Sequence, residues 1–260
     1  MTGFEAGRPS PPRTTLTSVR IPGPCRPARY QDRPNKLECR AWLEPEDELV
    51  AIQLPTPGGL TELLASSARL WVRAAEHTQR PSWVLAIIET REGVLIGVDP
   101  EPARALVAAG IQNDDFPELA GFEVSRADVA SGTSRFDLEL ESHSGGSMLA
   151  SIYSVSLTAN HVGLFPDVPL PRASRQIRTL ARRADSGQPA AIFFIVQRID
   201  VGRVMPSRHI DSELTEALRE AQLAGVRIIG RRCQVTLEEL VLGVSVEVKI
   251  PAPARSGSRS

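Results

Sequence analysis

Short hydrophobic runs separated by turn residues fill the first third of the chain. The runs are rich in Val, Ile, Leu and Trp, which favour β-strands, and Pro55–Gly59 and Arg91–Gly93 are typical turn sequences between them. Strands are predicted at Lys36–Leu43, Glu48–Leu54, Arg69–Ala74, Trp83–Glu89 and Val94–Val98. Several short strands in so few residues predict a small barrel of the OB type.

Beyond Val98 the hydrophobic spacing alternates between helical and strand periods. Helices are predicted over Glu101–Ala109, Ala173–Ala184 and Asp211–Ala224, and strands over Ser134–Glu141, Met148–Leu157, Ala190–Val196, Val226–Ile229 and within Val235–Ile250. Asp211 is a suitable N-cap for the last helix, and Gly225 a suitable stop. This order predicts an α/β (α+β) sandwich around a mixed sheet.

Proline and polar residues gather at the two ends of the chain. Residues 1–34 hold seven of the 21 prolines, which remove backbone donors and disfavour regular structure. The predicted division is therefore a flexible tail over 1–24, an OB-like domain over 25–98, an α/β domain over 99–250 and a second flexible tail over 251–260.

The 260 residues carry a formal net charge of −1, but the charges are segregated along the chain. Residues 1–40 hold eight basic and three acidic side chains (+5), residues 41–168 seven and nineteen (−12), and residues 169–260 fifteen and nine (+6). Such segregation indicates an oriented electrostatic surface. Near-neutrality therefore does not exclude a polyanionic partner; it predicts weak, salt-sensitive binding by one face.

Composition excludes several classes of protein. Apolar runs such as Trp83–Ile88 and Pro189–Val196 are far shorter than the roughly 20 residues that span a bilayer. The first residues lack the apolar core of a secretory signal, so we expect a cytoplasmic protein with no membrane contact. Cys25, Cys39 and Cys233 are scattered, which argues against a zinc site or a disulfide framework.

Several segments together indicate a family. They are Leu164–Val168 (LFPDV) followed by Arg172, Gly187–Arg198 (GQPAAIFFIVQR), Pro206–Asp211 (PSRHID) and Glu220–Val226 (EAQLAGV), with weaker matches at Asp128–Asp137 (DVASGTSRFD) and Pro55–Thr61 (PTPGGLT). In these segments the chain resembles the sugar fermentation stimulation protein A (SfsA) family. The matches run in order from about Arg33 to Ile250, which is nearly the whole ordered chain.

The resemblance implies an OB-like barrel followed by a sandwich of the PD-(D/E)xK nuclease type, with DNA binding as the activity. In such nucleases, carboxylates on neighbouring strands hold Mg²⁺, and a lysine orients the attacking water. Asp137 matches the first carboxylate and Asp128 an upstream glutamate. These two residues are therefore the candidate catalytic and metal-binding residues.

The second strand of the expected site departs from the family. Ser151–Leu157 (SIYSVSL) stands where the family has Glu-Val-Lys-Ser-Val-Thr-Leu, so Ser151 replaces the acid and Tyr153 the lysine. A serine hydroxyl is a poor Mg²⁺ ligand, and tyrosine, with a pKa of about 10, supplies no cation. We therefore predict a site that is catalytically inactive or badly weakened; Mg or Mn is expected as a cofactor only if the nuclease site has been rebuilt.

Other acidic residues bear on that rebuilt-site alternative. Glu139 and Glu141 share the strand face of Asp137, although a solvated polar face is the simpler interpretation. The same alternation predicts an opposite, buried face made of Phe136, Leu138 and Leu140. Glu247-Val-Lys249 repeats the acid-x-Lys spelling in the last predicted strand, and we interpret it as a coincidence.

Basic residues supply the candidate nucleic-acid contacts. One side of the helix after the Phe-Pro-Asp segment carries Arg172, Arg175, Arg178, Arg182 and Arg183, with no acid before Asp185. Such a stripe suits phosphates, although a solvated helix face has the same pattern. The family's histidine in this segment is replaced by Gln176. In the barrel, Arg33, Lys36 and Arg80 match basic family positions, but the family's aromatic residues beside them are missing.

Three hypotheses remain open from the sequence. The first is an SfsA-like protein that binds DNA non-specifically without catalysis, as a transcriptional or chromosome-associated factor, with single-stranded DNA or RNA as alternative partners. The second is a nuclease with a rebuilt Mg- or Mn-dependent site. The third is a non-catalytic scaffold whose acidic middle segment contacts another protein or a second copy of itself, which leaves a homo-oligomer open.

Overall fold

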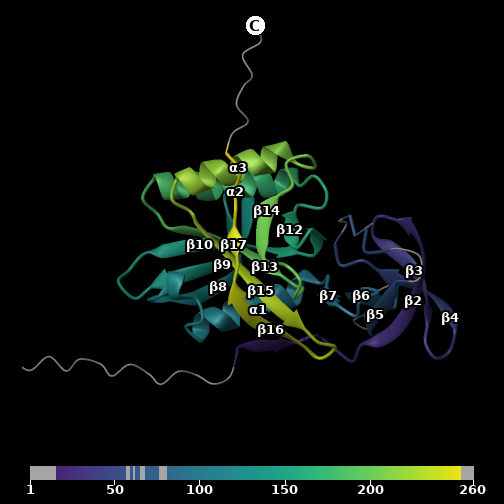
Figure 1. Cartoon of the computed structure of the whole chain (residues 1–260). Helices are drawn as coiled ribbons and strands as arrows, with labels where there is room; N and C mark the ends of the chain where they lie inside the picture. The colour runs from purple at the N-terminus through teal and green to yellow at the C-terminus, as the bar shows by residue number, and fades with distance from the viewer. Residues whose placement is uncertain (1–15, 57–58, 61, 65–67, 76–80, 253–260) are drawn as a thin grey trace, which may run out of the picture.

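The computed structural model describes residues 16–56, 59–60, 62–64, 68–75 and 81–252. A β-barrel and a larger α/β domain lie side by side; the barrel is on the right of Figure 1, and the helices of the larger domain lie above and below its central sheet. The predicted fold class, an OB-like barrel followed by a nuclease-like α/β sandwich with a mixed sheet, is confirmed.

The barrel is built from β2 (Arg26–Asn35), β3 (Glu38–Leu43), β4 (Glu48–Gln53), β5 (Arg69–Ala74), β6 (Trp83–Glu89) and β7 (Leu95–Gly97). Their order is β4-β3-β2-β5-β6-β7, and a further pairing of β4 with β6 closes the ring. All the strands predicted in this part of the chain are present. β2 was not predicted, because prolines such as Pro27 and Pro34 are rare inside strands.

The larger domain is organised around a seven-stranded sheet with the order β1-β16-β15-β13-β10-β9-β8. Its strands are β1 (Ser18–Arg20), β8 (Phe122–Ser131), β9 (Ser134–Ser142), β10 (Ser147–Val155), β13 (Ala190–Val196), β15 (Arg227–Val235) and β16 (Glu239–Ser245). The central strands β10, β13 and β15 run parallel, and their outer neighbours pair antiparallel. The sheet is therefore mixed, as predicted.

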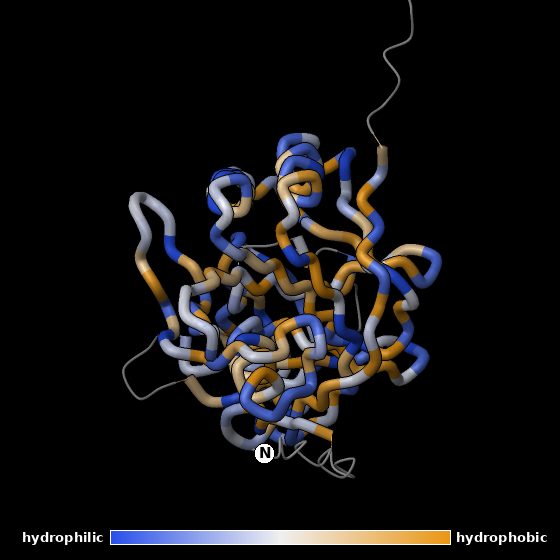
Figure 2. Tube along the Cα trace, turned by 90° about the vertical axis from the view of Figure 1, so that its left-hand side faces the viewer, coloured by the Kyte–Doolittle hydropathy of each residue, from blue (hydrophilic) through white to orange (hydrophobic). Residues whose placement is uncertain are grey.

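Helices cover both faces of this sheet. α1 (Pro100–Gln112), followed by the short helix η1 (Pro117–Leu119), packs on one face, and α2 (Pro171–Asp185) and α3 (Ser212–Leu223) pack on the other. Figure 2 shows hydrophilic residues on the outer sides of the two upper helices and hydrophobic residues along the strands beneath them. The side chain of Asp211 caps α3, and Gly225 has a φ of 84°, so both predicted end signals of this helix are confirmed.

A small second sheet lies at the edge of the domain. It contains β11 (Leu157–Ala159), β12 (Val162–Phe165), β14 (Arg203–Pro206) and β17 (Glu247–Val248). The sequence between Val235 and Ile250 is thus divided between two sheets. Val235 ends β15 and Glu239–Ser245 form β16, both in the large sheet, whereas Glu247 and Val248 form β17 in the small sheet and Lys249 follows directly after it. That string is therefore in a different sheet from Asp137.

The predicted N-terminal tail, residues 1–24, contains an ordered strand. β1 pairs antiparallel with β16, with Val19 opposite Leu240, and Ile21 behind it is buried. Its partner strand lies at the other end of the chain. The local composition, rich in proline, therefore could not reveal it.

The prediction that Phe136, Leu138 and Leu140 share one face of their strand is wrong for Phe136. All three are buried, but Leu138 and Leu140 pack in the core beside α1, whereas Phe136 packs in the core beside α2. The ladder between β9 and β10 ends at Leu138, and beyond it the twisted β8–β9 hairpin continues without β10. This separation of the two strands creates the candidate site.

A polar cluster at the start of α1 joins the barrel to the larger domain. The Asp99 carboxylate caps α1 by accepting from the Glu101 amide at 3.0 Å, and it also accepts from Arg73 of β5 at 3.0 Å. The Gln197 amide donates to the Asp99 carbonyl at 2.9 Å and to Ser154 Oγ at 3.1 Å. These bonds fix the first turn of α1 against the carboxyl ends of β10 and β13.

Candidate functional site

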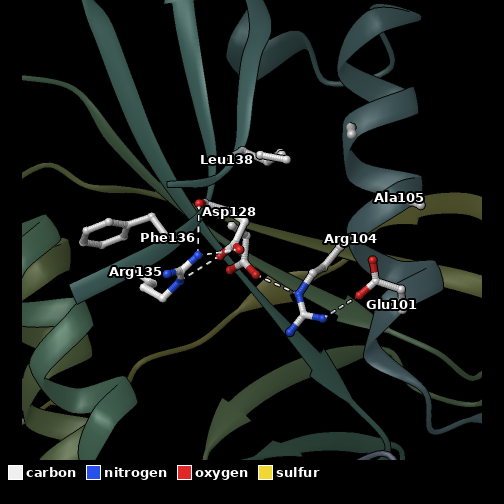
Figure 3. A pocket seen from close by; sticks show the side chains of 10 residues that line it. Glu101, Arg104, Ala105, Asp128, Arg135, Phe136 and Leu138 are labelled. Atoms are coloured by element: carbon white, nitrogen blue, oxygen red, sulfur yellow. Dashed lines mark hydrogen bonds and ion pairs between the residues drawn. The ribbon is translucent and has the colours of Figure 1, made fainter. Parts of the chain in front are cut away.

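A cleft of about 580 Å³ opens where β9 and β10 part. α1 forms one wall and the β8–β9 hairpin the other, as Figure 3 shows. Asp137 lies on β9 at this point, and its side chain is only 16% exposed. Its Oδ2 accepts from the Ile152 amide of β10 at 2.7 Å, so the carboxylate bridges the two strands where their ladder has ended.

Arg104 of α1 occupies the other oxygen of Asp137. Its Nε donates to Asp137 Oδ1 at 2.8 Å, and its Nη1 donates to Glu101 Oε2 at 2.9 Å. Partial burial lowers the pKa of Arg104, but the charge of Asp137 and the hydrogen bonds to Asp137 and Glu101 outweigh it, so the pKa is raised overall. The carboxylate therefore has a permanent cation beside it.

The two replaced positions of the expected site differ in burial, since Ser151 is buried and Tyr153 is half-buried. Ser151 is fully buried, and its hydroxyl makes no hydrogen bond with any described residue. Tyr153, next on the same strand face, donates its hydroxyl hydrogen to Gln176 Oε1 of α2 at 3.0 Å. Burial raises the pKa of the Tyr153 hydroxyl, and the charge of Asp137 raises it further, so this group stays neutral at physiological pH.

These residues do not fit a divalent cation. Mg²⁺ and Ca²⁺ prefer several carboxylate or carbonyl oxygens, and the described part of the chain contains no group of three acidic, His or Cys side chains that could hold a metal ion. Glu139, the acid that could have completed a rebuilt site, accepts from Arg126 Nε at 2.8 Å instead. The charge that a metal would neutralise on Asp137 is neutralised by Arg104.

Asp128, the second candidate acid, lies on the outer rim of the cleft. It is exposed, adopts a φ of 54°, and accepts from Arg135 Nε at 2.9 Å and from Arg135 Nη2 at 2.5 Å. These hydrogen bonds hold the pKa of Asp128 below its usual range. The structure thus places Asp128 and Asp137 along one cleft, each paired with its own arginine.

A second cleft, of about 620 Å³, begins on the other side of Arg135. Its lining residues are Thr133, Ser134, Arg135, Arg172, Arg175 and Gln176. Arg172 and Arg175 are exposed at the start of α2, and neither forms an ion pair with any acid that the structure describes. Three arginines and two hydroxyl side chains therefore surround one space whose charge is suited to phosphate groups.

The rest of the predicted arginine stripe has other partners. Arg178 lies 3.3 Å from Glu220 and 4.0 Å from Glu213, both on α3, so acids from a neighbouring helix neutralise it. Arg183 donates to the Ser147 carbonyl at 2.9 Å, and Arg182 to Thr179 Oγ1 at 3.1 Å. The helical spacing identified the arginines but could not identify these partners.

The candidate residues of the barrel lie apart from these clefts. Arg33 donates to the carbonyl groups of Gly59, Asn35 and Lys36, which supports the loop around Gly59. Lys36 is exposed in the turn between β2 and β3. Arg80 lies outside the described residues.

Two arginines of the site, Arg104 and Arg135, are not predicted from the sequence. Arg104 lies in a helix whose sequence indicates only packing, and Arg135 lies inside the Asp128–Asp137 segment without a spacing that indicates its partner. Because Arg104 lies on α1 and Asp137 on β9, no spacing within the chain predicts their contact. The one available signal was the loss of the acid and the lysine at Ser151 and Tyr153, since an unpaired buried carboxylate requires another partner.

The architecture and the site together define a class: a β-barrel joined to a nuclease-like α/β domain with a conspicuous carboxylate where two strands part. A family model described as "Sugar fermentation stimulation protein RE domain" matches residues 101–239. The chain also shares 31% identity over 233 residues with the sugar fermentation stimulation protein homolog of Moorella thermoacetica, which covers 89% of this chain and all of that protein. The chain belongs to the SfsA family, as the sequence predicted.

A solved structure of the same family agrees with this fold. The structure of Pyrococcus furiosus SfsA in complex with Ca²⁺ superposes with a TM-score of 0.81 at 22% identity, covering 89% of this chain and 98% of that one. A repair endonuclease from Pyrococcus abyssi has a TM-score of only 0.28 at 11% identity over 81% of this chain and 85% of that one, a likeness too slight to support an argument. No helix in the described part of the chain is long and apolar enough to cross a membrane.

Proposed function

We propose that this protein binds DNA through the arginine-lined clefts on the β8–β9 and α2 side of its larger domain, and that it does so without cleaving the DNA. The observation that carries the proposal is the Arg104–Asp137 pair, because it puts a guanidinium where hydrolysis would need a metal ion. Binding without cleavage is the activity of a regulatory or chromosome-associated factor, and such a protein would act in the cytoplasm.

The two clefts support a continuous binding surface. Arg135 lines both of them, with Arg104 at one end and Arg172 and Arg175 at the other. Guanidinium groups remain charged at all physiological pH values and bind phosphate oxygens in pairs. Because no element in this arrangement reads base edges, the proposed binding is non-specific and dominated by counterion release.

Gel shifts with a short DNA duplex at low and moderate salt test the binding. The variant Arg172→Ala/Arg175→Ala should weaken binding at every salt concentration and lower the slope of log Kd against log salt by about 2, because each removed phosphate contact lowers it by roughly 0.9. The charge-matched control, Arg20→Ala/Arg91→Ala, changes two exposed arginines in β1 and in the turn before β7, outside the cleft-lining residues. Equal effects of both double variants would refute the cleft proposal.

A second experiment tests the absence of cleavage. Supercoiled plasmid incubated with the protein and either Mg²⁺ or Mn²⁺ should remain supercoiled over hours. Nicking that disappears in Asp137→Ala would overturn this part of the proposal and establish the rebuilt nuclease instead. The structure gives that alternative no support, because Glu139 and Asp128 already pair with Arg126 and Arg135.

A further inference from the structure

A third cleft, of about 240 Å³, lies between the barrel and the larger domain. Arg104 belongs to its lining as well as to that of the Asp137 cleft, so the two spaces are neighbours that share this residue. The walls are mostly apolar or aromatic, from Leu60, Ile152, Tyr153, Leu157, Leu164 and Phe165. Pockets for drug-sized ligands measure roughly 300–1,000 Å³, so this one suits a single small ring system.

One wall of this third cleft is a fixed aromatic cluster. The Tyr153 ring lies 5.0 Å from Phe165 and 5.8 Å from Phe194, measured between ring centroids. The Tyr153 hydroxyl is held from behind by Gln176, and Phe165 and Phe194 are almost completely buried. The Tyr153 ring is therefore held in place beside the cleft, and little conformational freedom is lost when another ring packs against it.

Polar groups are few and stand at defined places around the same cleft. Among the described lining residues, Thr56, Ser154 and Ser156 carry hydroxyls, Asp167 carries a carboxylate, and Arg104 carries the one guanidinium. A ligand that fits this chemistry has a flat, largely apolar ring with hydrogen-bonding edges and an anionic group a short distance away. A nucleotide has this construction, with its base for the aromatic cleft and its phosphate for Arg104.

We infer that the third cleft takes one unpaired nucleobase of the bound DNA, stacked on Tyr153, while the adjoining phosphate accepts from Nη2 of Arg104, the guanidinium nitrogen that donates to neither Asp137 nor Glu101. The inference rests on the proposed function, and it assigns a use to the substitution at position 153. A lysine there would serve hydrolysis, whereas the tyrosine ring offers a stacking surface. Single-stranded DNA should then bind more tightly than a fully paired duplex of the same length, since its bases need not be unpaired first.

The experiment uses a single-stranded oligonucleotide containing 2-aminopurine and a fully paired duplex without it. With the full-length protein, stacking should quench the 2-aminopurine fluorescence. Tyr153→Leu should abolish the quenching and weaken single-strand binding at least about fivefold, whereas duplex binding should stay within about twofold. The control Tyr153→Phe keeps the ring and should retain the quenching.

A second variant distinguishes the loss of stacking from a loss of folding in Tyr153→Leu. Leu157→Trp fills the cleft from the small sheet and should give the same two losses while circular dichroism shows an intact fold. If both variants keep the quenching and the single-strand affinity of the wild type, the inference is wrong, but the proposed function is unaffected. If the wild-type protein binds neither duplex nor single strand, the proposed function fails, and this inference fails with it.

Discussion

Tyr153 and Gln176 are direct partners: the Tyr153 hydroxyl donates to Gln176 Oε1 over 3.0 Å, and the Gln176 amide donates in turn to the carbonyl of Arg135. The two side chains stand where the family resemblance expects a lysine and a histidine. Their contact joins β10, α2 and the β8–β9 hairpin around the candidate site. The contact between these two neutral side chains fixes the orientation of the Tyr153 ring.

The stability of the protein should depend on Tyr153 at high pH. Burial raises the pKa of Tyr153 above its ordinary value of 10.0, so the folded state holds the phenolic proton more tightly than the unfolded state does. The stabilisation is full below about pH 10 and is lost as the pH rises above that value, by at most about 1.4 kcal/mol per pH unit. Urea unfolding from pH 8 to 11 should show a smaller fall for Tyr153→Phe than for the wild type. Parallel curves would contradict this prediction.

Asp137 should contribute to stability through two separable contacts. Asp137→Asn keeps an acceptor oxygen for the Ile152 amide and loses the charge beside Arg104, whereas Asp137→Ala loses both. We expect Asp137→Ala to lower the free energy of unfolding by about 2 kcal/mol and Asp137→Asn by about half as much. Urea denaturation measures both variants. A double-mutant cycle with Arg104→Ala should give a coupling of about 1 kcal/mol, and additivity would show that the ion pair has no net effect.

Removing the charge of Asp128 should tighten DNA binding. Asp128 holds Arg135 on the exposed rim between the two clefts, and asparagine tolerates its φ of 54°. In Asp128→Asn the Arg135 charge is no longer offset, so duplex affinity at low salt should rise by about threefold, and the gain should vanish at high salt. Glu92→Ala in the turn before β7 is the charge-matched control. Weaker or unchanged binding in Asp128→Asn would mean that Arg135 does not face the DNA.

Asp99 should stabilise the fold as both a helix cap and an ion-pair partner. Its side chain caps α1 and pairs with Arg73, with only 8% of the side chain exposed. Asp99→Ala loses both contacts and should cost about 3 kcal/mol of unfolding free energy. Asp99→Asn keeps the cap, since asparagine caps helices as well as aspartate, and should cost clearly less. Equal losses in thermal and urea unfolding would show that the cap contributes little.

Local features of the sequence determined much of the secondary structure. Hydrophobic runs predicted the observed boundaries of β5, β6 and β13, and Asp211 and Gly225 marked the ends of α3. These signals act between residues that are close in the chain, so they can be recognised without knowing the fold. The family and the loss of the acid and the lysine at Ser151 and Tyr153 were equally visible, because residue identity is a property of the sequence alone.

The partners of the site residues were decided by the tertiary structure alone. Arg104 reaches Asp137 because α1 packs beside the point where β9 leaves β10, and Arg178 is neutralised because α3 lies next to α2. Phe136 turns into the other core for the same reason, since the hairpin twists once its ladder with β10 has ended. Periodicity fixes which face of an element is buried, but strand register and helix placement fix which side chains meet across it.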